Sequence, residues 1–213
     1  MKANTTKAKA VLFDLDGVLV NSMKAWFYVI NDTLNYFGFK SISFRQFKSR
    51  FGASIEHDAE TLYNGKPIND IEKAYNKFFG GRRKYVKLSH QAKPVLKDLK
   101  RKNIKIGLIT NSTKYITLIT LEYFKLKKYF DVIVTMNDVR YGKPKPNMVL
   151  KACKMLKVNP SNTILVGDTK NDMIAGKRAG CVTVGFKIKG DCRINKLKEI
   201  LYMFKHKHMF TKS

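Results

Sequence analysis

An apolar run at residues 10–15, Ala-Val-Leu-Phe-Asp-Leu, is closed by Asp16-Gly17 near the start of the 213-residue chain. A short run of this kind, ended by a turn signal, is typical of a strand that is buried on both of its faces. Strands buried in this way belong to parallel sheets whose faces are covered by helices. The run therefore predicts one strand of such a sheet, with two aspartates at its carboxyl end.

The segment after this strand changes to a helical period. Apolar residues recur at spacings of three, four or seven over residues 23–37, which predicts an amphipathic helix. Ser43 and Ser54 are candidate caps for two further helices. Asn69 and Glu72 form a capping-box pattern that would open a fourth helix.

Residues 21–89 contain no strand-like alternation, whereas helices and short apolar strands alternate from Lys93 onward. Predicted strands cover residues 104–109, 130–135, 163–166 and 181–186, separated by helices at 94–102, 114–126, 146–157 and 171–179, with a closing helix at 195–204. This alternation predicts a parallel sheet with crossover helices, to which the first strand belongs. The expected fold class is α/β: a parallel Rossmann-like sheet core, residues 1–20 and 90–213, with an inserted all-helical cap domain, residues 21–89.

Composition and charge exclude several classes of protein. A hydrophobic content of 44% excludes an intrinsically disordered chain, and no apolar run reaches the length of a membrane span. Three cysteines without a Cys-x-x-Cys pair indicate neither a disulfide framework nor a zinc site, so we expect a cytoplasmic protein. The net charge of +26 is spread over the chain, which favours nonspecific polyanion binding over a dedicated nucleic-acid site. The oligomeric state stays open.

Chemically reactive side chains follow the predicted strands at their carboxyl ends, where open α/β sheets bind ligands. They are Asp14 and Asp16 after the first strand, Thr110 and Asn111 after the second, Lys143 in a loop after the third, and Asp168 and Asp172 after the fourth. Neighbouring carboxylates raise one another's pKa, and a divalent cation removes that conflict. All-oxygen ligation with few carboxylates suits Mg²⁺, which commonly shares its ligands with a substrate phosphate. The set therefore predicts phosphoryl transfer.

Each of these groups alone has an ordinary structural interpretation. The Asp-x-Asp-Gly pattern can be a turn, and Thr110 can be a buried structural hydroxyl. Lys143 is one of 42 basic residues, and Asp168 with Asp172 can cap a helix. What favours a functional site is the ordered occurrence of all four groups at strand ends.

These residues form four ordered motifs that resemble those of the haloacid dehalogenase-like hydrolases, specifically the helical-cap subgroup and its phosphoglycolate phosphatase-like members. The motifs are Phe-Asp-Leu-Asp-Gly-Val-Leu at 13–19, Ile-Thr-Asn at 109–111, Gly-Lys-Pro-Lys-Pro at 142–146, and Val-Gly-Asp at 166–168 continuing to Asp172. The resemblance spans residues 10–186, and the predicted insertion lies where that subgroup carries its cap.

The resemblance implies a role for each matched residue. Asp14 would attack phosphorus and form an aspartyl-phosphate. Asp16 would protonate the leaving oxygen and then deprotonate the water that cleaves this intermediate. Thr110 and Asn111 would bind the transferring phosphoryl group, and Lys143 would balance its charge.

The resemblance also implies a metal site. Mg²⁺ would be bound by Asp14, Asp168 and the main-chain carbonyl of Asp16, with Asp172 beside them. Dehalogenases lack the second aspartate of the first motif, so the presence of Asp16 favours phosphate esters as substrates. The chain departs from the family pattern at Asn21, where most members with this first motif carry aspartate.

Two cap positions bear on the choice between a hydrolase and a sugar-phosphate mutase. The mutases carry histidine where this chain has Trp26, and arginine where it has Ile55. A mutase is therefore the weaker interpretation. We expect Trp26 to belong to the cap core, and Arg45 and Arg50 to lie on solvated helix faces.

The leading functional hypothesis is a Mg²⁺-dependent phosphatase that hydrolyses small phosphomonoesters through an aspartyl-phosphate, with 2-phosphoglycolate as the first candidate substrate. The +26 charge favours an alternative, a phosphatase acting on nucleotide or nucleic-acid phosphate ends. A third class is a non-catalytic binding module with the same fold, and the intact reactive set argues against it.

Overall fold

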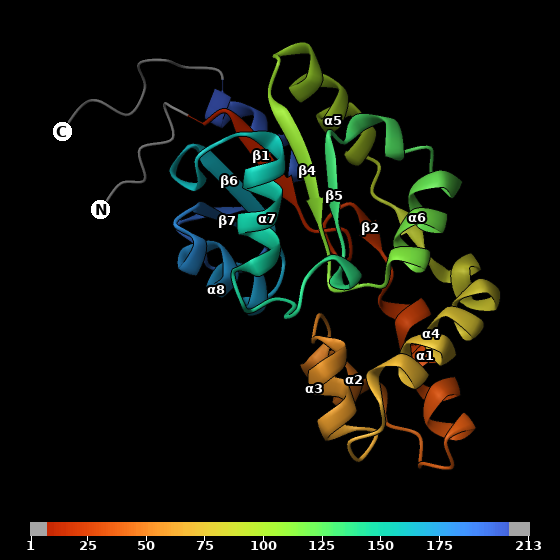
Figure 1. The fold of residues 1–213 in the computed structure, drawn as a ribbon. Coiled ribbons are helices and arrows are strands. Elements are labelled where there is room, and N and C mark those ends of the chain that lie inside the picture. Colours follow the sequence, from red (N-terminus) through yellow and green to blue (C-terminus); the bar gives the residue numbers. More distant parts are fainter. Residues whose placement is uncertain (1–7, 205–213) are drawn as a thin grey trace.

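The computed structural model describes residues 8–204, so residues 1–7 and 205–213 of the predicted core lie outside the described residues (Figure 1). Six strands form one sheet in the order β5-β4-β1-β6-β7-β8. They are β1 (Ala10–Phe13), β4 (Lys105–Ile109), β5 (Val132–Val134), β6 (Thr163–Gly167), β7 (Val182–Phe186) and β8 (Cys192–Ile194). Every neighbouring pair is parallel, which confirms the predicted α/β fold class.

The strand β1 lies in the middle of this sheet, between β4 and β6. Val11 and Phe13 belong to one hydrophobic cluster and Ala10 and Leu12 to the other, and all four are fully buried. Successive side chains of a strand point to opposite faces, so a central strand covered on both faces needs apolar residues at every position. This explains the continuous apolar run in the sequence.

Helices cover both faces of the sheet. The helix α7 (Asn147–Leu156) contacts β4 and β5, and α8 (Lys170–Ala179) contacts β6 and β7. The helix α5 (Ala92–Arg101) packs with the closing segment η6 (Leu197–Phe204), a 3₁₀ helix at the position of the predicted closing helix. The remaining helical segments of the core are α6 (Lys114–Tyr123), η3 (Lys127–Tyr129), η4 (Met136–Asp138) and η5 (Pro160–Asn162).

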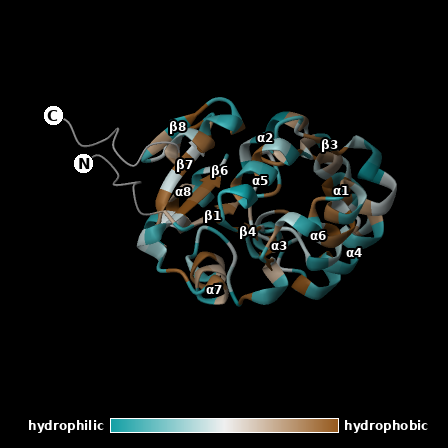
Figure 2. Ribbon diagram, turned by 90° about the horizontal axis from the view of Figure 1, so that it is seen from above, coloured by the Kyte–Doolittle hydropathy of each residue, from teal (hydrophilic) through white to brown (hydrophobic). Residues whose placement is uncertain are grey.

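A second group of helices lies between β1 and α5 in the sequence and at one end of the sheet in space (Figure 1). It comprises α1 (Met23–Tyr36), α2 (Phe44–Arg50), α3 (Ile55–Thr61), α4 (Ile68–Arg82) and η2 (Arg83–Tyr85). Aromatic rings fill its interior: Trp26 lies 5.4 Å from Tyr75 and 5.7 Å from Phe79, between ring centroids. Figure 2 shows apolar segments along β1 and β6 inside the molecule and polar segments on the outer turns of the helices.

The helix starts in this group were predicted in part. Ser43 and Ser54 cap α2 and α3 through their side chains, as expected. The expected capping box at Asn69 is wrong, because α4 already begins at Ile68 and Pro67 occupies the cap position. Asn69 therefore lies inside the first turn, where its side chain cannot accept from the helix start.

The expectation that residues 21–89 contain no strand is also wrong in one detail. The two-residue strand β2 (Val20–Asn21) pairs antiparallel with β3 (Lys87–Leu88). The two chain connections between the sheet and the helical group run side by side there, and pairing satisfies their backbone groups. In residues 8–204, no helix is both long and apolar enough to cross a membrane.

Candidate active site

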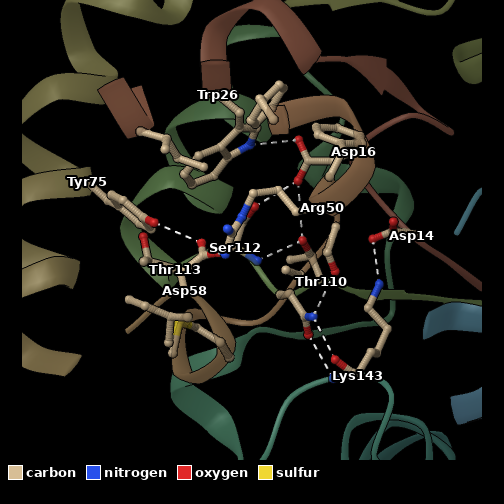
Figure 3. A pocket seen from close by; sticks show the side chains of 18 residues that line it. Asp14, Asp16, Trp26, Arg50, Asp58, Tyr75, Thr110, Ser112, Thr113 and Lys143 are labelled. Carbon is tan, nitrogen blue, oxygen red and sulfur yellow. Dashed lines mark hydrogen bonds and ion pairs between the residues drawn. The ribbon is translucent and has the colours of Figure 1, made fainter. Parts of the chain in front are cut away.

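The carboxyl ends of three adjacent strands carry the predicted site. Asp14 follows β1, Thr110 follows β4 and Asp168 follows β6, and these strands are neighbours in the sheet. A pocket at this edge is lined by side chains from both the core and the helical group (Figure 3). Adjacent parallel strands thus bring together residues that are up to 154 positions apart, as the loop pattern in the sequence predicts.

Asp14 has the environment of a restrained carboxylate. Its side chain is buried, and its Oδ1 accepts hydrogen bonds from the Leu15 N–H at 2.8 Å and the Lys143 ammonium at 2.8 Å. Oδ2 receives no hydrogen bond from the described residues. Burial raises the pKa of Asp14 well above its ordinary value, neighbouring carboxylates raise it further, and Lys143 opposes the shift.

Lys143 lies between two carboxylates, with its Nζ 2.8 Å from Asp14 and 2.6 Å from Asp172. Burial lowers the pKa of this ammonium, but the carboxylates of Asp14 and Asp172 raise it more, so Lys143 is charged. The Asn111 side chain holds its backbone: the amide accepts from the Lys143 N–H at 2.8 Å and donates to the Lys143 carbonyl at 3.0 Å. The position of the cation is therefore fixed from both ends of the residue.

Three carboxylates could hold a cation. Asp14, Asp168 and Asp172 each offer an oxygen, and these oxygens all lie within 4.8 Å of one another. Oδ1 of Asp168 is buried without a hydrogen-bond partner among the described residues, and burial, followed by the charge of Asp172, raises the pKa of Asp168 to about 7. A Cβ on Gly17 would lie 1.9 Å from Asp168 Oδ2, so only glycine leaves room for this carboxylate. The donor set and the orphaned oxygen fit Mg²⁺.

Asp172 has other partners as well. Its Oδ1 meets Lys143, and its Oδ2 accepts from the Thr169 hydroxyl at 2.5 Å and the Thr169 N–H at 3.0 Å. Both oxygens are thus engaged within the core, and the bond from the Thr169 N–H is one half of the capping box of α8. This arrangement suits a residue that orients Lys143 and contributes negative charge beside the cation.

The Asp16 carboxylate is directed away from this acidic group and toward the helices. Its Oδ1 accepts from the Ser22 hydroxyl and from Trp26 Nε1 at 3.3 Å. Its Oδ2 accepts from the Ser112 hydroxyl at 2.7 Å and from Thr110 Oγ1 at 3.5 Å (Figure 3). The structure therefore groups the carboxylates of Asp14, Asp168 and Asp172. The Asp16 carboxylate lies apart from them, and Asp16 was expected to bind the metal through its main-chain carbonyl.

Thr110 and Asn111 both line the pocket. Thr110 Oγ1 accepts from the Ser112 N–H at 3.1 Å, and its side chain is buried. The Asn111 amide is committed to the Lys143 backbone and donates to the Gly52 carbonyl at 3.3 Å. The Asn111 side chain is thus part of the scaffold of the pocket.

The structure corrects two expectations about the helical group. Trp26 lies in the apolar interior as expected, but it also lines the pocket and donates to Asp16. Arg50 is not on a solvated face: its side chain is 14% exposed, forms an ion pair with Asp58 at 2.7 Å and lines the pocket. Ser112, which donates to Asp16, directly follows Thr110 and Asn111, so its position in the sequence could have indicated it. No local sequence pattern indicates that Arg50 belongs to the pocket.

Comparisons with known proteins agree with this geometry. The family model described as haloacid dehalogenase-like hydrolase matches residues 11–186. The pyrophosphatase PpaX of Bacillus mycoides is 30% identical, covering 89% of this chain and 87% of that protein. A putative phosphoglycolate phosphatase from Lactobacillus plantarum superposes with a TM-score of 0.85 at 21% identity, over 93% of this chain and 100% of that one. A β-phosphoglucomutase from Clostridium difficile gives 0.81 at 22% identity, over 92% and 97%. The chain belongs to the haloacid dehalogenase-like hydrolases.

Proposed function

We propose that the protein is a Mg²⁺-dependent phosphatase that hydrolyses small phosphomonoesters through an aspartyl-phosphate on Asp14. One observation carries the proposal: Lys143 and the Leu15 N–H restrain Oδ1 of Asp14, and Asp14, Asp168 and Asp172 each offer one oxygen within 4.8 Å of the others. A carboxylate nucleophile and a phosphate are both negatively charged and repel each other. A fixed ammonium group beside the reaction centre offsets that repulsion.

The residues divide the reaction into two steps. Oδ2 of Asp14 attacks phosphorus while Asp16 gives its proton to the leaving alkoxide oxygen. Asp16 then takes a proton from the water that attacks the aspartyl-phosphate, which releases phosphate and restores Asp14. Thr110 Oγ1 and the Asn111 N–H would bind the phosphoryl oxygens, and Lys143 would balance their charge.

A bound Mg²⁺ would be held by Asp14, Asp168 and the Asp16 carbonyl, and would neutralise charge on the phosphoryl group. Asp172 would support this site through Lys143. We propose further that residues 21–89 act as a cap on a core of residues 1–20 and 90–213. The pocket supports this division, because its walls come from both parts.

The first candidate substrate is 2-phosphoglycolate, and pyrophosphate is a second because relatives at about 30% identity are named pyrophosphatases. Phosphorylated nucleotide or nucleic-acid ends remain an alternative that the +26 charge favours. A mutase stays the weaker alternative, because Trp26 and Ile55 occupy the two positions that differ from the mutases. A cytoplasmic location and nonspecific polyanion binding stay predictions.

Release of phosphate from a panel of substrates tests the proposal. The panel contains 2-phosphoglycolate, pyrophosphate, an end-phosphorylated oligonucleotide and p-nitrophenyl phosphate, each with Mg²⁺ and with EDTA. We expect steady turnover that EDTA stops and that Asp14→Asn abolishes, whereas Asp70→Asn on the exposed surface of α4 has no effect. Absence of turnover for every ester would instead support the binding-module hypothesis, and full activity of Asp14→Asn would refute the assigned nucleophile.

A further inference from the structure

The pocket contains a second cation that the proposed chemistry does not use. Arg50 is the last residue of α2 and lines the pocket together with Lys143. Among the described lining residues these two carry the positive charges. The proposed chemistry assigns Lys143 to the phosphoryl group, whereas Arg50 has no role in it.

Arg50 is held by hydrogen bonds that use part of its donor capacity. Its Nη2 donates to Asp58 Oδ1 at 2.7 Å and to Thr61 Oγ1 at 2.5 Å. Nε is buried and has no partner among the described residues. A guanidinium has five N–H donors. The two hydrogen bonds at Nη2 fix its orientation, and the buried Nε donor is left unsatisfied.

Asp58, which orients Arg50, is itself fixed. Its Oδ2 accepts from the Tyr75 hydroxyl at 2.8 Å, and the Tyr75 hydroxyl accepts from Tyr63 at 3.2 Å. Asp58 is 6% exposed, and burial raises its pKa although Arg50 lowers it. The Arg50 guanidinium is therefore preorganised by a buried polar network rather than by a solvated surface pair.

The surroundings of Arg50 favour an anionic group over a neutral polar one. Besides Arg50, Asp58 and Tyr75, the cap side of the pocket is largely apolar, with Ile30, Phe47, Phe51 and Ile55 in its wall. Figure 3 shows Arg50 between the pair Asp14 and Lys143 and the pair Asp58 and Tyr75. An unsatisfied donor of a buried guanidinium is costly, and a carboxylate or a phosphate can accept from Nε and from an adjacent N–H at once.

We propose that Arg50 is a specificity-determining residue that binds a second anionic group, a carboxylate or a phosphate, on the leaving group of the substrate. The proposal rests on the phosphatase function proposed above. Nη2 keeps its hydrogen bond to Asp58, and the substrate anion accepts hydrogen bonds from the remaining N–H groups of the guanidinium. The preferred substrates are then compact phosphomonoesters or pyrophosphate, in which a second anion lies a few bonds from the phosphorus that is attacked.

The unaltered protein provides the first test. Ethyl phosphate has the shape of 2-phosphoglycolate with a methyl group in place of the carboxylate. We expect kcat/KM for 2-phosphoglycolate, or for pyrophosphate, to exceed that for ethyl phosphate by about 100-fold, as for loss of one buried charged hydrogen bond. A higher kcat/KM for 2-phosphoglycolate would identify the second anion as a carboxylate, and a higher kcat/KM for pyrophosphate would identify it as a phosphate. Equal values for all three substrates overturn the proposal but leave the phosphatase function intact, and no turnover of any ester refutes that function.

Variants then assign the preference to Arg50. Arg50→Met combined with Asp58→Asn removes both charges and avoids a buried unpaired carboxylate. Arg45→Met, on the exposed face of the same helix, is the matched control. We expect the double variant to lose the about 100-fold preference while its kcat/KM for ethyl phosphate changes by less than about threefold. A parallel loss for all substrates, or an unchanged preference, overturns the proposal.

A conservative variant keeps the test decisive if the double variant does not fold. Arg50→Lys retains the charge but replaces the planar group with a single ammonium, which cannot form paired hydrogen bonds. We expect a reduced preference, expressed mainly as a higher KM for the anionic substrate, with kcat for ethyl phosphate unchanged. An unchanged KM for the anionic substrate counts against the proposal.

Discussion

The side-chain amide of Asn171 donates a hydrogen bond to the main-chain carbonyl of Gly52 at 3.1 Å, and thereby joins the core to the loop between α2 and α3. The Asn111 amide donates to the same oxygen at 3.3 Å. Asn111 lies in the loop after β4, and Asn171 lies in the first turn of α8, close in sequence to Asp168 and Asp172. One main-chain carbonyl of the helical group is thus bound by both sides of the proposed site.

The first prediction concerns this contact. Asn171→Ala removes one donor to Gly52 and leaves Asp168 and Asp172 in place. We expect kcat/KM for p-nitrophenyl phosphate to fall by about three- to tenfold, which corresponds to the free energy of one neutral hydrogen bond. The reason is that the conformation in which the loop contacts the core becomes less populated. Asn195→Ala, an exposed core position, should leave kcat/KM unchanged. Unaltered kinetics of Asn171→Ala would show that the contact does not govern closure.

The second prediction concerns the backbone of Gly52, which has φ +83°, a conformation that favours glycine. A Cβ there would lie 2.7 Å from Thr169 Cγ2. Gly52→Ala should therefore hinder docking of the loop on the core and lower kcat/KM by about tenfold, with a smaller effect on thermal unfolding.

A second substitution distinguishes two causes of the expected loss: steric contact with Thr169 and strain of the backbone at residue 52. Thr169→Ser removes Cγ2 but keeps the hydroxyl that caps α8. In the Gly52→Ala background we expect it to restore part of the lost kcat/KM. If activity does not recover, the cost arises from the left-handed backbone of the loop and contact with Thr169 is not limiting.

The third prediction tests Trp26 as a positioning residue for Asp16. Trp26→Phe keeps an aromatic ring beside Tyr75 but removes the N–H that donates to Asp16. We expect kcat to fall by about three- to tenfold with little change in KM, because Asp16 is less firmly oriented for proton transfer. Rapid-quench measurement should show slower formation and slower hydrolysis of the aspartyl-phosphate. A change confined to KM would instead indicate a substrate contact.

The sequence predicted well the residues whose positions follow from the parallel sheet. A strand buried on both faces must be apolar at every position, so residues 10–13 were recognisable without any tertiary information. Parallel topology then places every strand's carboxyl end at one edge, which is why Asp14, Thr110 and Asp168 could be grouped.

The positions that sequence did not predict depend on contacts between helices. Arg50 has the local pattern of a surface residue, and its burial follows from Asp58 and Thr61, eight and eleven positions away in the chain. The strand β8 was missed because it is only three residues long and its middle residue is the exposed Arg193. The burial of Arg50 therefore could not be derived from periodicity.

The last prediction concerns the stability of the acidic group without metal. Burial and the neighbouring carboxylates hold the pKa of Asp14 above its ordinary value, so ionised Asp14 costs folding free energy at neutral pH, a cost absent below the ordinary carboxyl pKa. In EDTA at neutral pH, Asp14→Asn should unfold at the same or a higher temperature than the unaltered protein. Added Mg²⁺ should raise the melting temperature of the unaltered protein more than that of the variant, because the variant has lost one charged ligand. Calorimetry measures both effects. Equal stabilisation of the two proteins by Mg²⁺ would place the cation away from Asp14, and a variant much less stable in EDTA would show that the ion pair with Lys143 outweighs burial.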